Sequence, residues 1–426
     1  MNKISQRSKL GLSILAAAMA IPAVSQAALV EDSKASLELR NMYQNRDVRN
    51  AHGANTDTHK EWAQGFKLRF ESGFTEGTVG VGIDALGMAG IKLDHSNGQN
   101  RNGSGVLNIN HKGDGRGDAE SSFGELGLTA KARISKTVLK LGTLEPMLPV
   151  VMANDARLLT STYAGGMITS QEIDGLTLNA GRLERHNDRD DSSNQKIRLR
   201  TPSYAGGVEA DRLDFAGGSY VISPELTASY YYGNMEDVYK QHFVGAVHNA
   251  NLGDGLTLRT DLRYFKSKDE GRALGGKIDN DFFNGMVTLG MNAHKFGLGY
   301  STVSGDGNFP YAAIDAYTVN SVSLTDFTLA DMDAWQLRYD LDFTSLGVPG
   351  LSFMTRYIYG DDAQVGTANT GKQIERDSLI SYAFQSGPIK GARVTWLNAT
   401  LRNGGGLTTQ DLNENRLIVS YTLPLL

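Results

Sequence analysis

The sequence predicts an all-β protein, a transmembrane antiparallel β-barrel. Apolar and polar residues alternate one by one along many segments, no helical period of 3.6 residues persists, and short turns alternate with longer polar stretches. Glycine is abundant (49 of 426 residues) and proline is scarce (9), which favours tight turns over disordered linkers. A mean hydropathy of −0.31 excludes a bundle of membrane helices but fits strands that turn half of their residues to a polar lumen.

Residues 1–27 are predicted to be a cleaved signal peptide. Lys3, Arg7 and Lys9 form a basic segment, residues 10–24 are apolar, and Ala27 ends a stretch of small residues that a signal peptidase reads. The apolar run has about 15 residues, fewer than the roughly 20 that a spanning helix needs. We therefore expect cleavage before Ala28 and one barrel domain over residues 28–426.

The alternation is clearest in five runs, which we predict to be strands with one apolar and one charged face: residues 35–40, 66–71, 128–134, 256–264 and 336–343. Turn signals separate such runs, among them Gly-Asp-Gly at 253–255 and 305–307 and Val-Pro-Gly at 348–350. The stretches 97–122 and 360–373 are predicted to be longer loops. Short turns at one end and long loops at the other are typical of outer-membrane barrels.

A soluble β-sandwich is the alternative fold, since its strands also alternate. It would require the 399 residues that follow position 27 to divide into two or three domains, and no linker or change of composition marks a boundary. One barrel of 16 to 22 strands uses about 18 to 25 residues per strand and connection, which fits strands of roughly 10 residues. The arithmetic favours the barrel.

Several function classes are excluded by composition. There is no cysteine, so disulfides, thiolate metal sites and cysteine nucleophiles are absent. The formal charge is −5, and about −8 without the signal peptide, which argues against nucleic-acid binding. The sequence has no G-x-S-x-G elbow, no H-E-x-x-H motif and no P-loop, and its histidines and Gly-Asp-Gly turns fit neither a standard zinc spacing nor a calcium loop, so we expect no enzyme activity, cofactor or metal. A barrel-embedded hydrolase stays open as a minor alternative, because His242 and His248 both fall on expected strands.

The registers place a set of arginines in the lumen. If Val394, Trp396, Leu417 and Val419 face lipid, Arg393 and Arg416 face inward. The opposite register would put arginine against lipid, at a cost of roughly 2–4 kcal/mol each near the midplane. The same rule gives a lumen position to Arg338, Arg356, Arg198, Arg200, Arg259 and Arg263.

Longer segments resemble the OprD-type family of substrate-specific outer-membrane porins. They include EDSKASLELR at 31–40, ESGFTEGTVGVGID at 71–84, LGLTAKARISKTVLKLGTLEPMLP at 126–149, NDARLL at 154–159 and RLIVSY at 416–421. The resemblance covers nearly the whole chain after residue 27. It implies an 18-stranded barrel narrowed by inward-folded constriction loops, and passive uptake of small carboxylate-bearing nutrients.

The resemblance also implies which residues contact solute. Arg393 and Arg416 match the family's row of basic side chains, and residues 154–166 resemble its constriction loop, with Arg157 as the anion-facing group. Residues 315–327 resemble a second inward loop that faces the basic row. The expected basic side is Arg157, Arg185, Arg338, Arg356, Arg393 and Arg416, and the expected acidic or polar side is Asp315, Ser321, Asp326 and Tyr204.

The sequence thus predicts an outer-membrane porin for small carboxylate-containing solutes, either amino acids and peptides or aromatic acids. Arginine suits this role because its charged fork fits a carboxylate with two hydrogen bonds. Expected partners are these solutes, outer-membrane lipid and lipopolysaccharide, with the protein a monomer or a loosely associated trimer. A general, weakly selective porin is the alternative.

Overall fold

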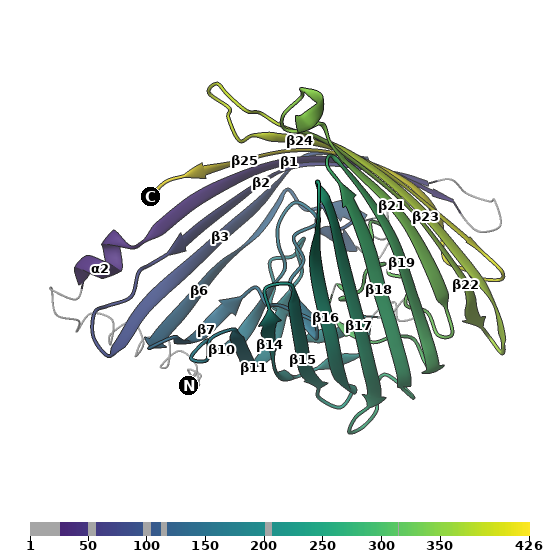
Figure 1. Cartoon of the computed structure of the whole chain (residues 1–426), viewed down its shortest axis with the longest axis horizontal. Helices are drawn as coiled ribbons and strands as arrows, with labels where there is room; N and C mark the ends of the chain where they lie inside the picture. Colours follow the sequence, from purple (N-terminus) through teal and green to yellow (C-terminus); the bar gives the residue numbers. More distant parts are fainter. Residues whose placement is uncertain (1–25, 50–56, 97–103, 112–116, 201–206, 314) are drawn as a thin grey trace, which may run out of the picture.

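The computed structural model describes residues 26–49, 57–96, 104–111, 117–200, 207–313 and 315–426. Eighteen antiparallel strands form one closed barrel, which confirms the expected fold class and strand number (Figure 1). The wall strands are β1 (Lys34–Arg49), β2 (Asp57–Glu71), β3 (Val79–His95), β6 (Ser122–Ile134), β7 (Thr137–Leu144), β10 (Thr162–Ser170), β11 (Leu176–Asn187), β14 (Leu213–Ser223), β15 (Leu226–Met235), β16 (Tyr239–Gly253), β17 (Leu256–Asp269), β18 (Asp279–Met291), β19 (His294–Asp306), β21 (Asp333–Asp342), β22 (Leu351–Val365), β23 (Ala368–Ala383), β24 (Arg393–Gly404) and β25 (Asp411–Pro424).

Each wall strand pairs with the next one along the chain, and the last pairs with the first. The β1–β25 register runs from Ser36 opposite Pro424 to Arg49 opposite Asp411. Closure leaves no free sheet edge, which a membrane-spanning sheet requires because lipid cannot satisfy backbone hydrogen bonds.

The remaining elements are short and are not part of the barrel wall: α2 (Gln26–Glu31), β4 (Ile109–His111), β5 (Gly117–Ala119), β8 (Met147–Leu148), β9 (Val151–Met152), β12 (Ile197–Arg200), β13 (Glu209–Ala210), β20 (Tyr311–Ala312) and η2 (Phe343–Leu346). Within the described ranges, no helix is long and apolar enough to cross a membrane. Residues 1–25 lie outside the described part of the chain, so the signal peptide remains a prediction.

The two faces of the strands differ as the alternation predicts. On β6, Leu126 and Leu128 point outward with 78% and 50% of their surface exposed, whereas Lys131 on the inner face is buried. Its ammonium pairs with the Asp84 carboxylate of β3 at 2.5 Å. On β24 and β25, Trp396 and Leu417 are outward and exposed, while Arg416 is buried inside, as expected.

Two sequence expectations about this wall were wrong. Residues 360–373 are not a loop but the tip of the β22–β23 hairpin, whose two strands are joined at Gly366, where φ is +63°. Both faces of this tip are polar, so the alternation that identified other strands is missing. Arg198 and Arg200 are not on a wall strand, because they belong to β12, which pairs with β13 and β20.

The lengths of the connections orient the barrel in the membrane. At one end the strands are joined by short turns, such as residues 135–136, 254–255 and 292–293. At the other end they are joined by long segments, including residues 145–161 and 307–332. Outer-membrane barrels have short periplasmic turns and long extracellular loops, so the second end is extracellular.

Candidate functional site

Two extracellular connections fold into the barrel and meet there. We call residues 145–161 the first inward loop and residues 307–332 the second inward loop. The first loop joins β7 to β10 but contacts β1 and β2, which are several strands away around the wall. The second joins β19 to β21 but contacts β23 and β25. The loops touch where Asn154 Nδ2 donates a hydrogen bond to the Asp315 carboxylate.

Basic side chains of β1 and β2 hold the first inward loop. Arg40 donates to the carbonyl oxygens of Asp155 (3.0 Å) and Arg157 (2.5 Å) and also pairs with the Asp155 carboxylate. Lys67 donates to that carboxylate at 3.1 Å. Gly65 of β2 has no side chain, and a Cβ there would lie 3.0 Å from Leu158 of the loop. The wall thus fixes the loop by charge and by close contact.

Carboxylates of β23 hold the second inward loop. Glu375, fully buried, accepts hydrogen bonds from the backbone N–H groups of Ser323 (3.0 Å), Leu324 (2.8 Å) and Thr325 (3.0 Å). Asp377 accepts from the Ser323 hydroxyl at 2.8 Å. Aromatic packing also holds the base of this loop, where the ring centroid of Phe309 lies 4.5 Å from that of Phe282 on β18.

A polar cavity of about 480 Å³ lies between these loops and the segment 188–196. Its lining carries arginines and aspartates in equal number: Arg46, Arg157, Arg189, Arg200, Asp188, Asp190, Asp315 and Asp326. Uncharged polar groups of Asn154, Ser321, Ser323 and Thr325 complete it. The cavity can therefore offer both cationic and anionic partners to one small solute.

The arginines of the cavity are held in different ways. Arg157 is 7% exposed, and it donates from Nε to Ser104 O (3.2 Å) and from Nη1 to Ala156 O (3.1 Å). Burial lowers the pKa of Arg157, and the neighbouring guanidiniums of Arg416 and Arg189 add to this effect. Arg189 donates to Asn154 Oδ1 at 2.6 Å. Arg157 thus makes no ion pair within the described residues, which leaves its charge available to a solute.

The acidic side of the cavity contains two carboxylates with perturbed titration. Burial raises the pKa of Asp190 to about 6, against the opposing charge of Arg189. Burial also raises the pKa of Asp326, while hydrogen bonds from the hydroxyls of Tyr311 (2.5 Å) and Ser321 (2.7 Å) oppose the shift. The charge of this side therefore depends on pH in the slightly acidic range.

The expected site residues fall into four groups. Arg157, Asp315, Ser321 and Asp326 line the cavity together. Arg416 and Arg356 do not line the cavity: Arg416 donates to Ser323 O of the second inward loop at 2.9 Å, and Arg356 pairs at 2.8 Å with Asp377, the carboxylate that accepts from the Ser323 hydroxyl. Tyr204 lies outside the described residues.

Arg393, Arg338 and Arg185 are away from the cavity lining. Arg393 is exposed in the lumen near the periplasmic end of β24, with one contact to Ser381 Oγ at 3.4 Å. Arg338 pairs with Asp340 of its own strand at 2.7 Å. Arg185 lies beside a bulge of β11 and donates to Glu184 O. The first inward loop also ends earlier than expected, because residues 162–166 already belong to β10.

Sequence reasoning missed four charged residues of the cavity, Arg46, Asp188, Arg189 and Asp190, and gave Arg200 a lumen position without placing it in the site. Arg46 is on β1, where its inward position follows from the alternation, and it pairs with Glu414 at 2.5 Å. Residues 188–191 read Asp-Arg-Asp-Asp, a charge run that looks like a solvated loop in sequence. Within the described residues, no three His, Asp or Glu side chains are grouped to hold a metal ion.

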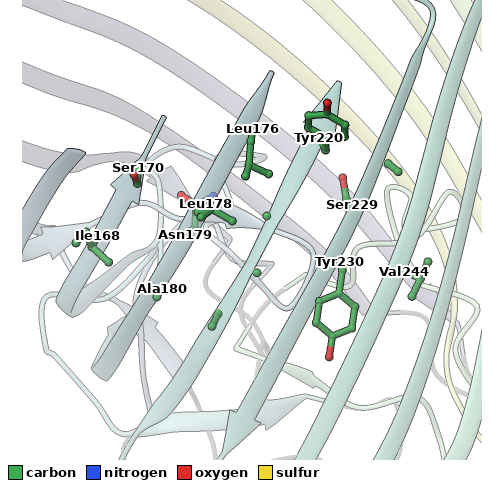
Figure 2. Close-up of a pocket in the computed structure, with 14 residues that line it drawn as sticks. Ile168, Ser170, Leu176, Leu178, Asn179, Ala180, Tyr220, Ser229, Tyr230 and Val244 are labelled. Atoms are coloured by element: carbon green, nitrogen blue, oxygen red, sulfur yellow. The ribbon is translucent and has the colours of Figure 1, made fainter. Parts of the chain in front are cut away.

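A second hollow, of about 800 Å³, lies on the outer wall over β10, β11, β14, β15 and β16 (Figure 2). Small residues leave it open, among them Ala180, Ala216 and Gly218. Leu178 and Tyr230 flank it and are 44% and 49% exposed, as expected of residues that face lipid. No charged side chain lines it. It is a feature of the lipid-facing surface and not of the pore.

Known proteins resemble the chain along nearly its whole length. A family model described as "outer membrane porin, OprD family" matches residues 27–425. Porin-like protein GalP of Pseudomonas putida is 37% identical over 415 residues, which cover 97% of each chain. The crystal structure of Pseudomonas aeruginosa OpdQ is 45% identical with a TM-score of 0.83, covering 94% of this chain and all of that one. The crystal structure of Pseudomonas aeruginosa OpdK with vanillate is 36% identical with a TM-score of 0.84, covering 93% of this chain and all of that one.

Proposed function

Because the chain belongs to the OprD family of outer-membrane porins, we propose that the cavity between its two inward loops is the selective constriction for small solutes that carry a carboxylate. The protein is a substrate-specific porin of the bacterial outer membrane and not an enzyme, since the matching family model and the relatives described above are porins. The observation that carries the proposal is the set of four arginines and four aspartates that line one cavity beside the two inward loops.

Arg157 is the proposed carboxylate contact, supported by Arg46 and Arg189. A guanidinium gives strong, directional hydrogen bonds to a carboxylate. The guanidinium of Arg157 has backbone carbonyls but no carboxylate as partners among the described residues, so a solute carboxylate does not have to displace an internal ion pair. Arg393, exposed nearer the periplasmic end, is the proposed next contact on the way through. Binding at each step must be weak enough for release.

Amino acids are the proposed substrate class, ahead of aromatic acids. A zwitterion places a cation and an anion a few ångströms apart, and a cavity with Asp315 and Asp326 beside Arg157 can receive both. The vanillate bound to OpdK is an aromatic carboxylate, which supports carboxylate recognition among relatives and keeps the aromatic acids as the second candidate. Each barrel encloses its own cavity, so we expect a monomer or a loosely associated trimer to work equally well.

Uptake into proteoliposomes tests the proposal. The solutes are arginine, benzoate and a neutral sugar of similar size, each at two salt concentrations. For Arg157→Gln we expect uptake of the carboxylates to fall about tenfold relative to the sugar, as for loss of one charge-assisted contact. The control is Arg259→Gln, a lumen arginine that pairs with Asp261 and does not line the cavity.

The outcomes separate the candidates. Faster uptake of arginine than of benzoate supports the amino-acid class, and the reverse supports aromatic acids. If the sugar keeps pace with both carboxylates in the wild-type protein, the channel is a general, weakly selective porin. Equal loss for carboxylates and sugar in Arg157→Gln would refute the role of this side chain.

A further inference from the structure

Several arginines of the wall point outward and not to the lumen, and two of them lie close together on β23 and β24. Arg376 of β23 lies between Glu375 and Asp377, which are fully buried on the inner face, and Arg376 is exposed on the outer face. Arg402 of β24 shares its face with Trp396, whose exposed fraction of 46% is typical of a lipid-facing ring. An arginine against lipid hydrocarbon is costly, so its presence on this face needs a partner.

These two side chains form one cationic patch with Lys372. Arg376 is opposite Thr400 in the β23–β24 register, and Arg402 is opposite Ile374, so the two arginines are diagonal neighbours on the same face. Diagonal neighbours have Cα atoms roughly 7–8 Å apart. Lys372, which is exposed, is the corresponding diagonal neighbour of Arg402 on its other side. We call Lys372, Arg376 and Arg402 the outer basic patch.

No described carboxylate forms an ion pair with the outer basic patch. Arg376 donates to the Asn398 amide oxygen, and Asn398 in turn donates to Asn415 Oδ1 at 3.0 Å. Arg402 donates to Asn413 Oδ1 (2.6 Å) and to the carbonyls of Leu401 and Leu412. Asp411 of the neighbouring strand accepts from the Asn403 backbone N–H instead.

Strand β17, elsewhere on the wall, shows the contrast. There Lys266 and Lys268 also point outward, but carboxylates of β18 neutralise them. Lys266 pairs with Asp279 and Asp281, each at 2.8 Å, and Lys268 with Asp279 at 3.5 Å. Carboxylates of the chain thus neutralise the cations of β17 but not those of the outer basic patch, which leaves the charge of the patch available to an anion from outside the chain.

We propose that the outer basic patch binds the phosphate groups of a phosphorylated glycolipid of the outer leaflet, of the lipopolysaccharide type. Arg402 lies two residues from the extracellular end of β24, and therefore on the side of the membrane where the outer leaflet lies. Guanidinium forks suit phosphate oxygens, and the nearby amides of Asn398, Asn413 and Asn415 add neutral hydrogen-bond partners. Tyr357, opposite Arg376 on β22 and 46% exposed, provides an interfacial ring beside the patch. This site is independent of the solute that crosses the pore.

The test is lipid binding to the purified, delipidated full-length barrel in a non-ionic detergent, counted by native mass spectrometry. The probes are lipid A with two phosphates and the same glycolipid after dephosphorylation. We expect wild-type protein to bind the phosphorylated form about tenfold more tightly. The double variant Arg376→Gln, Arg402→Gln should lose that difference. The matched control Lys266→Gln, Lys268→Gln, which removes outward cations that already have carboxylate partners, should keep it.

Four results would overturn the proposal. The first is equal binding of both glycolipids by the wild type, a comparison that needs no variant to fold. The second is an arginine variant that still prefers the phosphorylated glycolipid, and the third is a control variant that loses this preference to the same extent. The fourth is a lipid-free oligomer that the arginine substitutions alone dissociate, because the patch would then be an interface between copies of this chain. Unchanged single-channel conductance of each variant verifies that its barrel is intact.

Discussion

Removing the Glu375 carboxylate should release the second inward loop and open the pore. Three backbone N–H groups of that loop donate to this one buried carboxylate, at 2.8 to 3.0 Å. A hydrogen bond contributes about 0.5–1.5 kcal/mol net of the water that replaces it, so the three together contribute roughly 2–4 kcal/mol to docking of the loop. Such a loss lowers the ratio of docked to undocked loop by about 30-fold to 1,000-fold.

Single-channel recording in planar bilayers measures this change. We expect Glu375→Ala to show a higher mean conductance and more current noise, with faster passage of both a carboxylate and a neutral sugar. The control is Asp84→Asn, which removes a lumen carboxylate that pairs with Lys131 and Lys140 of the wall. If Glu375→Ala keeps wild-type conductance and noise, the loop is held by its packing and not by this carboxylate, and the reasoning fails.

Two further predictions concern the first inward loop and the charge of the cavity. Gly65→Val should displace Leu158, because Leu158 lies 3.0 Å from an ideal Cβ at Gly65, and the displaced loop should narrow the lumen. We expect a lower single-channel conductance while the barrel itself stays intact. An unchanged conductance would count against this contact. Lowering the pH from 7.5 to 5 should increase anion preference, because Asp190 has a raised pKa of about 6 and becomes neutral as the pH falls, which removes one negative charge from the cavity. The reversal potential in a salt gradient measures this, and Asp190→Asn should remove the step near pH 6.

The wall could be predicted from the sequence because its determinants are local. A period of two decides which side of a strand faces lipid, and the inward positions of Arg393 and Arg416 followed from the outward positions of Trp396 and Leu417. The rule fails where both faces of a strand are polar. The β22–β23 tip was therefore missed, and no expectation was formed for Arg376, whose outward position breaks the usual preference.

The cavity could be predicted only in part, because its contacts join distant segments. Arg40 reaches Asp155, 115 residues away, and Asn154 reaches Asp315, 161 residues away. The family resemblance identified the two inward loops and four of the lining residues. It could not indicate that the 188–190 segment enters the same cavity, since those charges look like a solvated loop when they are read alone.

The origin of the lining residues decides which part of the protein sets solute choice. Among the residues that line the cavity, only Arg46 and Leu412 come from wall strands, and all others come from connections between them. The wall charges Arg40, Glu375 and Arg416 instead bind those connections in place. Substitutions in the loops can therefore change the shape and charge of the cavity while the hydrogen-bonded barrel stays intact. Substitutions of the wall charges should act through loop position, and so alter the passage of charged and neutral solutes together. Selectivity and conductance are for this reason expected to respond to different residues, even though all of them face the same lumen.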